Sequence, residues 1–476
     1  MRPLFRSLTA STLALSLAAC SSLPTPLNRP DDVPAGFTAP QTAPATAPIW
    51  PETTWWNNFQ SDELGPLEEL AQKENLDIAI YRARVLQAEA ANGVAFAGIL
   101  PTANFTDSYT HTQGSTPVQQ PKNNFRFGLT ASYQQNIFGQ QYYNLEAARE
   151  NLRAARYAQA VIGISIAATV ADQYFIILSL RERIAISRAN IEAAKRILAI
   201  TQAKVSSGVS SNLDLAQQQG IVAQQESLLP GLIQAEREAR YALAILLGRA
   251  PEGFDVKAQR LDIVSPAVRP GLPSEVLLRR PDVSNAEAVL YAAHANVDAA
   301  RAAFFPSISL SGGTAYATTI FENLFNPTSF VWTLSTSITQ TIFGGGAIKA
   351  GLEQQKAREA EMIATYRKTV FNAFSEVETG LGRVQATGEQ LDRLDVQVKA
   401  YAEAFRISEL QYREGTIDIL ALLNAQQQLF SAQNAFVQTK LARLEANLSL
   451  YQSLGGGWTQ ANDDATYQYQ LDWWPL

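Results

Sequence analysis

The residues able to do covalent or acid–base chemistry are few and scattered along this chain of 476 residues. Its only cysteine is Cys20, so disulfides and thiolate metal sites are excluded within one chain. The two histidines, His111 and His294, lie far apart in the sequence and in unlike contexts. We find no nucleophile motif, no convergent acid–base set and no metal-ligand spacing. The sequence therefore predicts neither an enzyme nor a metal site.

Cys20 is the one residue with a chemical role to predict, and that role is covalent modification. Residues 1–19 place arginines before a short apolar stretch, which is the pattern of a signal peptide. The stretch ends Leu17-Ala18-Ala19-Cys20, which matches the lipobox of bacterial lipoproteins. There the cysteine becomes the first residue and carries a diacylglycerol and an N-acyl chain. The alternative is an ordinary secretory signal with a chance cysteine, and no other cofactor is predicted.

The segment after Cys20 predicts a tether. Residues 20–51 are dominated by prolines and small residues, as in an extended linker without a core. Ser21, rather than an aspartate, follows the cysteine, and the sorting rule for lipoproteins then indicates the outer membrane. No later run of about 18 apolar residues exists, so no transmembrane helix is predicted. The net charge of -6 and the lack of a basic stripe disfavour a nucleic-acid partner.

The rest of the chain is one building block used twice. Apolar and polar residues alternate from Phe125 to Ile137 and again from Phe330 to Ile342, which is a strand signature. Each strand is followed by a long helical pattern with the heptad spacing of a coiled coil. The heptad positions of the first helix are Ile177, Ile184, Ile191, Leu198 and Val205. Gly208 and Gly415 mark the turns at which these helices end.

The two repeats are expected over residues 52–273 and 274–454, with an irregular tail over residues 455–476. The elements predicted in the first repeat are a helical pattern over 64–96, strands 101–109 and 125–137, a long helix 140–206, a return helix 212–247 and an irregular segment to 273. Those predicted in the second are a helix 274–303, strands 306–316 and 330–342, a long helix 347–413 and a return helix 419–454.

Four strands with one apolar and one hydroxyl-rich face predict an oligomeric barrel. In water the apolar face would be exposed, and in lipid the sheet edges would lack hydrogen-bond partners. A closed barrel solves both problems, but four strands are too few to enclose a pore. About three copies would supply about twelve strands, which is enough. A soluble β-sandwich attached to coiled coils is the alternative. The predicted fold class is therefore an α+β membrane protein.

The sequence resembles the outer-membrane factors, the TolC-like exit ducts, in their lipoprotein branch typified by OprM and NodT. The most specific match is residues 271–283, GLPSEVLLRRPDV, and it continues through residues 303–310, AFFPSISL. The resemblance implies a homotrimer with a twelve-stranded outer-membrane barrel and a periplasmic tunnel of helices in a Gram-negative bacterium. It also implies a periplasmic adaptor and an inner-membrane pump, of the resistance-nodulation type in this branch.

The resemblance further implies a gate at the helix turns near Gly208 and Gly415. Carried over by spacing, Asp214 and Tyr412 would form a hydrogen-bonded latch, unless Asp214 merely caps its helix. The family's ring aspartate is replaced here, whereas the apolar gate position is kept. The remaining candidates are Ile417, Asp418, Leu420 and Asn424, the last of these at the position of the ring aspartate. We expect closure mainly by leucine packing and amide contacts.

The function predicted is a passive, gated exit duct for small molecules, coupled through the adaptor to an inner-membrane transporter. No nucleotide-binding motif is present, so a partner must supply the energy. The alternative is a lipid-anchored coiled-coil tether or scaffold without a pore. In that case the alternating strands would have no purpose.

Overall fold

The computed structural model describes residue 34 and residues 36–39, 47–113 and 122–458. The predicted signal peptide, the lipidated Cys20 and the tail beyond residue 458 lie outside the described residues. The account that follows concerns the compact unit that begins at Gly36.

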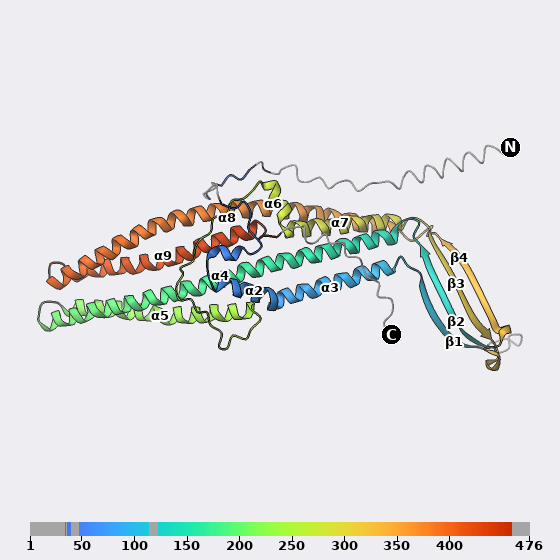
Figure 1. Cartoon of the computed structure of the whole chain (residues 1–476), viewed down its shortest axis with the longest axis horizontal. Coiled ribbons are helices and arrows are strands. Elements are labelled where there is room, and N and C mark those ends of the chain that lie inside the picture. The colour runs from blue at the N-terminus through green and yellow to red at the C-terminus, as the bar shows by residue number, and fades with distance from the viewer. Residues whose placement is uncertain (1–33, 35, 40–46, 114–121, 459–476) are drawn as a thin grey trace. The chain divides into compact units, whose positions relative to one another are not determined.

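Two long helices run through this unit, and shorter helices lie along each of them (Figure 1). The long helices are α4 (Gln140–Ser206) and α8 (Ala347–Glu414). Along α4 lie α3 (Leu76–Ala97) and α5 (Asn212–Leu246), and along α8 lie α7 (Pro281–Ala302) and α9 (Ile419–Ser453). The lengths match in pairs: 67 and 68 residues for the long helices, 22 for α3 and α7, and 35 for α5 and α9. Helices of matching length in the same order are expected when one structural unit occurs twice in a chain.

Two helices expected to be single are each broken in two. The pattern over 64–96 divides into α2 (Leu64–Glu74) and α3, because Asn75 is extended and its side chain caps α3. The helix predicted over 274–303 divides into α6 (Pro273–Arg279) and α7. Its break lies at Arg280, which is extended because Pro281 restricts the residue before it.

The four strands form one antiparallel sheet in the order β1-β2-β3-β4. Their bounds are β1 (Thr102–Thr112), β2 (Lys122–Gln135), β3 (Ser307–Thr318) and β4 (Phe330–Thr339). The second and fourth strands end two or three residues earlier than predicted, and the first and third end two or three residues later. The short helices η2 (Phe321–Asn323) and η3 (Pro327–Ser329) connect β3 to β4. The sheet lies at one end of the helices (Figure 1).

The register of the sheet separates an apolar face from a polar one. Directly paired residues lie on the same face of a sheet. One row across the four strands is Phe105, Leu129, Thr314 and Trp332, and the next is Asn104, Thr130, Gly313 and Thr333. In the first row Phe105, Leu129 and Trp332 are 58%, 58% and 71% exposed. The predicted alternation is therefore present, and these three apolar side chains are largely uncovered within the described part of the chain.

Close approach of β2 to β3 is made possible by glycines on both strands, Gly128 on β2 and Gly313 on β3. A Cβ atom added to Gly128 would lie 2.3 Å from the carbonyl oxygen of Thr314 on β3. Because that oxygen belongs to the backbone, a larger residue would have to push the two strands apart.

The main apolar core lies around the middle of α4. It contains η1 (Trp55–Phe59) together with residues of α2, α4 and α9. Tyr174, Phe175 and Tyr451 are at most 1% exposed there, and Phe59 packs its ring 5.2 Å from that of Phe175.

By length and composition, α4 also holds an 18-residue window apolar enough to cross a membrane, contrary to the prediction that no such helix exists. Half of that window is buried in the protein, as expected of a core helix.

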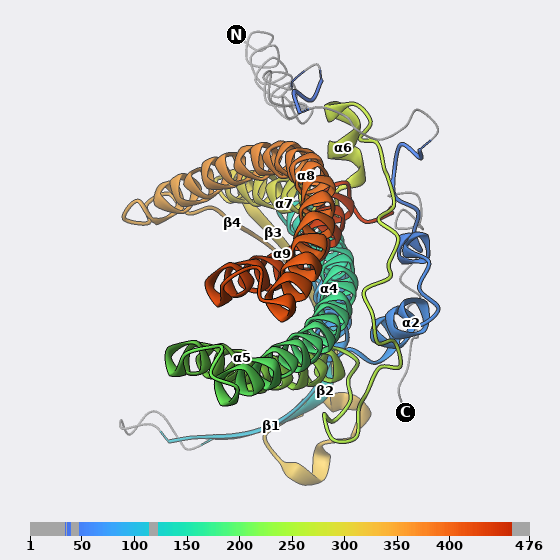
Figure 2. The ribbon, with the colours of Figure 1, turned by 90° about the vertical axis from the view of Figure 1, so that its left-hand side faces the viewer.

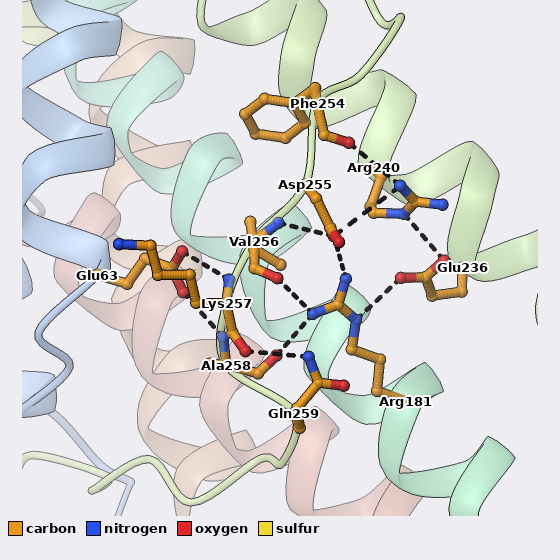
Figure 3. A network of polar contacts seen from close by, with 10 residues as sticks. All are labelled: Glu63, Arg181, Glu236, Arg240, Phe254, Asp255, Val256, Lys257, Ala258 and Gln259. Atoms are coloured by element: carbon orange, nitrogen blue, oxygen red, sulfur yellow. Dashed lines mark hydrogen bonds and ion pairs between the residues drawn. The ribbon is translucent and has the colours of Figure 1, made fainter.

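The irregular segment after α5 is fixed to α4 by one arginine (Figure 3). Arg181 donates from Nε to Glu236 of α5 at 2.9 Å, and it forms an ion pair with Asp255 of the segment. It also donates to the carbonyl oxygens of Val256 and Ala258 at 2.6 and 2.7 Å. A single guanidinium on α4 thus satisfies acceptors from α5 and from the irregular segment, which holds a segment without regular structure against the helices.

Glu68 of α2 is fully buried, and neither carboxylate oxygen has a hydrogen-bond partner among the described residues. Burial raises its pKa well above the ordinary value. Because the folded state holds this proton more tightly than the unfolded state, stability should fall as the pH rises above the ordinary carboxyl pKa. The slope is about 1.4 kcal/mol per pH unit, and the loss is complete once the pH has passed through the raised pKa.

We therefore expect Glu68→Gln to unfold at the same temperature as the wild type near pH 4 and at a higher temperature near pH 8. Thermal unfolding in detergent at the two pH values measures this. The exposed Glu69→Gln is the control, and a parallel pH dependence of all three proteins would contradict the prediction.

Candidate gate at the hairpin tips

The first helix turn is stabilised by a reciprocal cap around Asp214. α4 ends at Ser206, and Gly208 adopts a positive φ of 73° between the two helices. Ser210 Oγ and the Ser211 amide donate to Asp214 Oδ2 at 2.5 and 3.0 Å, and the Asp214 amide donates to Ser211 Oγ at 3.2 Å. The hydrogen bond from the Ser210 hydroxyl, followed by that from the Ser211 amide, lowers the pKa of Asp214. The Asp214 carboxylate therefore accepts its hydrogen bonds from residues of its own turn.

The second turn is built in a similar way. α8 ends at Glu414, and Gly415 caps it with a φ of 77°, as a left-handed glycine commonly does. Asp418 then caps α9 by accepting a hydrogen bond from the Ala421 amide at 2.9 Å. Both turn glycines predicted from the sequence thus lie in left-handed conformations at the ends of the long helices.

Tyr412 joins the two hairpins, and its partners come from α4. It is 4% exposed, and its hydroxyl lies 3.1 Å from Thr201 Oγ1. Thr201 already donates to the carbonyl oxygen of Ile197, so Tyr412 is the donor in this pair. The ammonium of Lys204 donates to the Tyr412 carbonyl oxygen and lies 4.4 Å from the centre of its ring. Tyr412 therefore binds α4 through its hydroxyl, its ring and its backbone.

The predicted hydrogen bond between Asp214 and Tyr412 is wrong within the chain. Asp214 bonds residues of its own turn, and the Tyr412 hydroxyl bonds Thr201. The alternative, in which Asp214 caps its helix, is the arrangement observed. Lys204 was missed by sequence reasoning, since its main partner is a backbone carbonyl that leaves no signal in the side-chain pattern. Thr201 lies at the second seam position of the heptad in the long helix, as Leu180, Ser187 and Ala194 do, and that spacing does not indicate a hydrogen-bond partner.

The other candidate residues divide between two faces of the second hairpin. Ile417 packs against an apolar cluster at the tip, whose buried members are Ala193, Ile197, Phe405, Tyr412, Ile419, Leu422, Leu429 and Phe430. Leu420 is 53% exposed, and Asn424 is also exposed. Being four residues apart on α9, Leu420 and Asn424 lie on the same face of the helix. They point away from this cluster and are available to other molecules.

The histidines have local polar partners. His111 lies in β1, which extends beyond the strand predicted over 101–109, and its Nδ1 is 2.8 Å from Asn123 Oδ1. His294 of α7 lies 2.6 Å from Glu359 of α8. Within the described part of the chain, no cluster of three or more potential metal-binding side chains is found.

Comparison with known proteins places the chain beside outer-membrane channels. The family model for outer membrane efflux protein matches residues 67–249 and 272–456. The pyoverdine export outer membrane protein OpmQ of Pseudomonas aeruginosa is 34% identical over 95% of this chain and 97% of its own. The cation efflux system protein CusC of Escherichia coli is 30% identical over 85% of this chain and 88% of its own. The solved structure of the outer-membrane channel OprN has a TM-score of 0.84 at 28% identity and covers 90% of this chain and 98% of OprN.

Proposed function

Because the chain belongs to the outer membrane efflux protein family, we propose that it is the gated exit duct of a tripartite efflux system. It is an outer-membrane protein of the Gram-negative type with a periplasmic tunnel, and its family consists of transport ducts rather than enzymes. The observation that carries the proposal is the two-faced sheet at one end of the long helices.

The sheet supports a trimeric barrel. Its apolar row, with Phe105, Leu129 and Trp332 exposed, is suited to lipid, and its row of Asn104, Thr130 and Thr333 is suited to water. The outer edges of β1 and β4 have no partner strand among the described residues. Both edges would be satisfied if β4 of one copy paired with β1 of the next, and three copies would give about twelve strands.

The lipid on Cys20 is the proposed anchor of each copy. The lipobox sequence and the proline-rich segment after it support this role. Mass spectrometry of the mature N-terminal peptide tests it, because a diacylglycerol and an N-acyl chain on Cys20 add a large and specific mass. An unmodified cysteine would exclude the anchor without affecting the proposed channel.

The partners proposed are a periplasmic adaptor and an inner-membrane pump of the resistance-nodulation type, which would supply the energy. The chain lacks a nucleotide-binding motif, and relatives are named as parts of efflux systems. The cargo proposed is a small molecule. OpmQ is named for export of pyoverdine, a cargo of this kind, and co-purification of the adaptor with the chain tests the partnership.

The gate proposed lies at the hairpin tips, where Leu420 and Asn424 share an exposed face of α9. A constriction lined by leucine restricts ion flow because it disfavours water. We expect Leu420→Ala to raise the single-channel conductance in planar bilayers on the order of twofold. Leu420→Ile, which conserves volume, should conduct as the wild type does. Equal conductance of Leu420→Ala and wild type would remove Leu420 from the gate.

The same measurement tests the proposed function as a whole. A lipid-anchored tether without a pore would show no discrete conductance steps at any protein concentration, whereas a duct would show uniform steps. The absence of such steps from correctly folded, trimeric protein would overturn the exit-duct proposal.

A further inference from the structure

A groove lies between the two hairpins, and on α9 it begins at Gln426, two residues after the gate candidate Asn424. Its walls are α5 and α9 and its floor is α4, in the middle of the coiled coils. Figure 2 shows α5 and α9 standing apart, with α4 between them and the α2 and α6 elements on the other side. The cavity measures about 400 Å³, which is within the range of sites for small organic molecules.

Polar atoms in the groove are buried without partners. Gln426 of α9 is 1% exposed, and neither its amide nitrogen nor its amide oxygen has a partner among the described residues. The hydroxyl of Ser187 on α4, a residue 7% exposed, likewise has none. Burying such groups without hydrogen bonds costs free energy, about 1–3 kcal/mol for each group. A ligand or water in the groove would satisfy them.

The charge of the groove is positive and not balanced by a carboxylate. Arg183 of α4 lines it and donates from Nε to Asn434 of α9 at 2.8 Å. None of the residues that line the groove is acidic, and no ion pair to Arg183 is found within the described part of the chain. Arg183 is half-buried, and this burial lowers its pKa. An anion would compensate this charge.

The rest of the lining is apolar or carries neutral amides. Ile221, Leu232 and Phe430 provide apolar surface, and Gln224 and Gln427 flank it. A ligand that matches this surface has a carboxylate for Arg183, hydrogen-bonding groups for the amides and an apolar body. A metal cation would meet no carboxylate among the lining residues.

We propose that this groove binds amphipathic organic carboxylates and that the exported cargo belongs to that class. The binding of carboxylates does not depend on the proposed export function, whereas the statement about the cargo rests on it. Because α5 and α9 belong to different hairpins, a ligand here would contact both at once.

The test is equilibrium binding of dansylglycine, a fluorescent carboxylate, to the full-length protein in detergent. Dansylamide, which has the same apolar body and no carboxylate, is the matched probe. We expect saturable binding of dansylglycine to the wild type. Arg183→Gln should raise the dissociation constant about tenfold or more, and the dissociation constant of Arg183→Lys should lie between those of Arg183→Gln and the wild type. Gln426→Leu should weaken binding of dansylglycine also. The control is Arg188→Gln, which changes an arginine of α4 that lines a different groove and should bind as the wild type does.

Equal affinity of the wild type and Arg183→Gln, or of dansylglycine and dansylamide, would overturn the inference. Size-exclusion chromatography and circular dichroism check that each variant is folded. If Arg183→Gln does not fold, the affinity of Arg183→Lys is compared with that of the wild type instead. Conductance measured on the same preparations separates the two proposals. A protein that conducts but does not distinguish the two probes keeps the exit-duct function and loses the carboxylate site, whereas one that distinguishes them without conducting keeps the site and loses the duct.

Discussion

Replacing Arg280 by methionine is expected to cost about 3 kcal/mol of stability, enough to deplete folded protein. The residue is 6% exposed and lies between α6 and α7. Its guanidinium donates to both carboxylate oxygens of Asp282, at 3.0 and 2.6 Å, and to the carbonyl oxygen of Ser453 at the end of α9, at 3.0 Å. A further ion pair at 2.7 Å joins it to Glu376 of α8. One side chain thus connects the junction of α6 and α7 to the second hairpin.

The size of the effect follows from what the substitution leaves behind. Burial alone would lower the pKa of Arg280, but the hydrogen bonds and charges of Asp282 and Glu376 outweigh it and raise the pKa. Removing one member of a buried ion pair costs roughly 3–5 kcal/mol. We expect a cost at the lower end of this range, because the side chains of Asp282 and Glu376 are 34% and 54% exposed and water can solvate their carboxylates when the arginine is removed.

The measurement is unfolding of the detergent-solubilised protein by denaturant. Arg280→Lys keeps the charge but cannot bind Asp282 with two parallel hydrogen bonds, so an intermediate loss is expected. Arg358→Met removes an exposed pair with Glu361 and should cost at most about 1 kcal/mol. If Arg280→Met were as stable as Arg358→Met, the hydrogen bonds and ion pairs of Arg280 would contribute no more to stability than an exposed ion pair does.

The sequence predicts the long elements well because their signals are local. The start of α4 at Gln140 and its end at Ser206 follow from the heptad pattern and the turn at Gly208. The faces of the strands follow from the alternation of residues, and the register of β1 and β2 bears this out at Phe105 and Leu129. Patterns of this kind depend only on which side chains must be buried together.

Features that depend on a specific neighbour were not predictable. The break at Arg280 had a visible cause in Pro281, but the continuous helical pattern on both sides concealed it. The partners of Asp214 and Tyr412 depend on which face of each helix meets which neighbour, and family spacing cannot supply that. The positive groove at Arg183 and Gln426 likewise requires three helices to be placed in space before its residues are seen together.

The Lys204 contact predicts how the closed tip is held. Its ammonium donates to the Tyr412 carbonyl oxygen and lies over the ring of that residue, so it joins α4 of one hairpin to α8 of the other. Opening of a tip requires one pair of packed helices to shift against another, and this contact would be lost if those hairpins separated. A hydrogen bond involving a charged group contributes about 1.5–3 kcal/mol.

We therefore expect Lys204→Met to raise the open fraction of the channel about tenfold or more, seen as a higher time-averaged current in planar bilayers. Tyr412→Phe removes only the hydroxyl bonded to Thr201 and keeps the ring and carbonyl, so about a fivefold rise is expected. The control is Lys195→Met, because Lys195 pairs with Glu226 inside the first hairpin and does not connect it to the second. A current through Lys204→Met no larger than that through Lys195→Met would show that the closed tip is held by other contacts. The apolar cluster that Ile197 of α4 forms with Phe405 and Phe430, and contacts between copies at the exposed face of Leu420 and Asn424, would then be the remaining candidates.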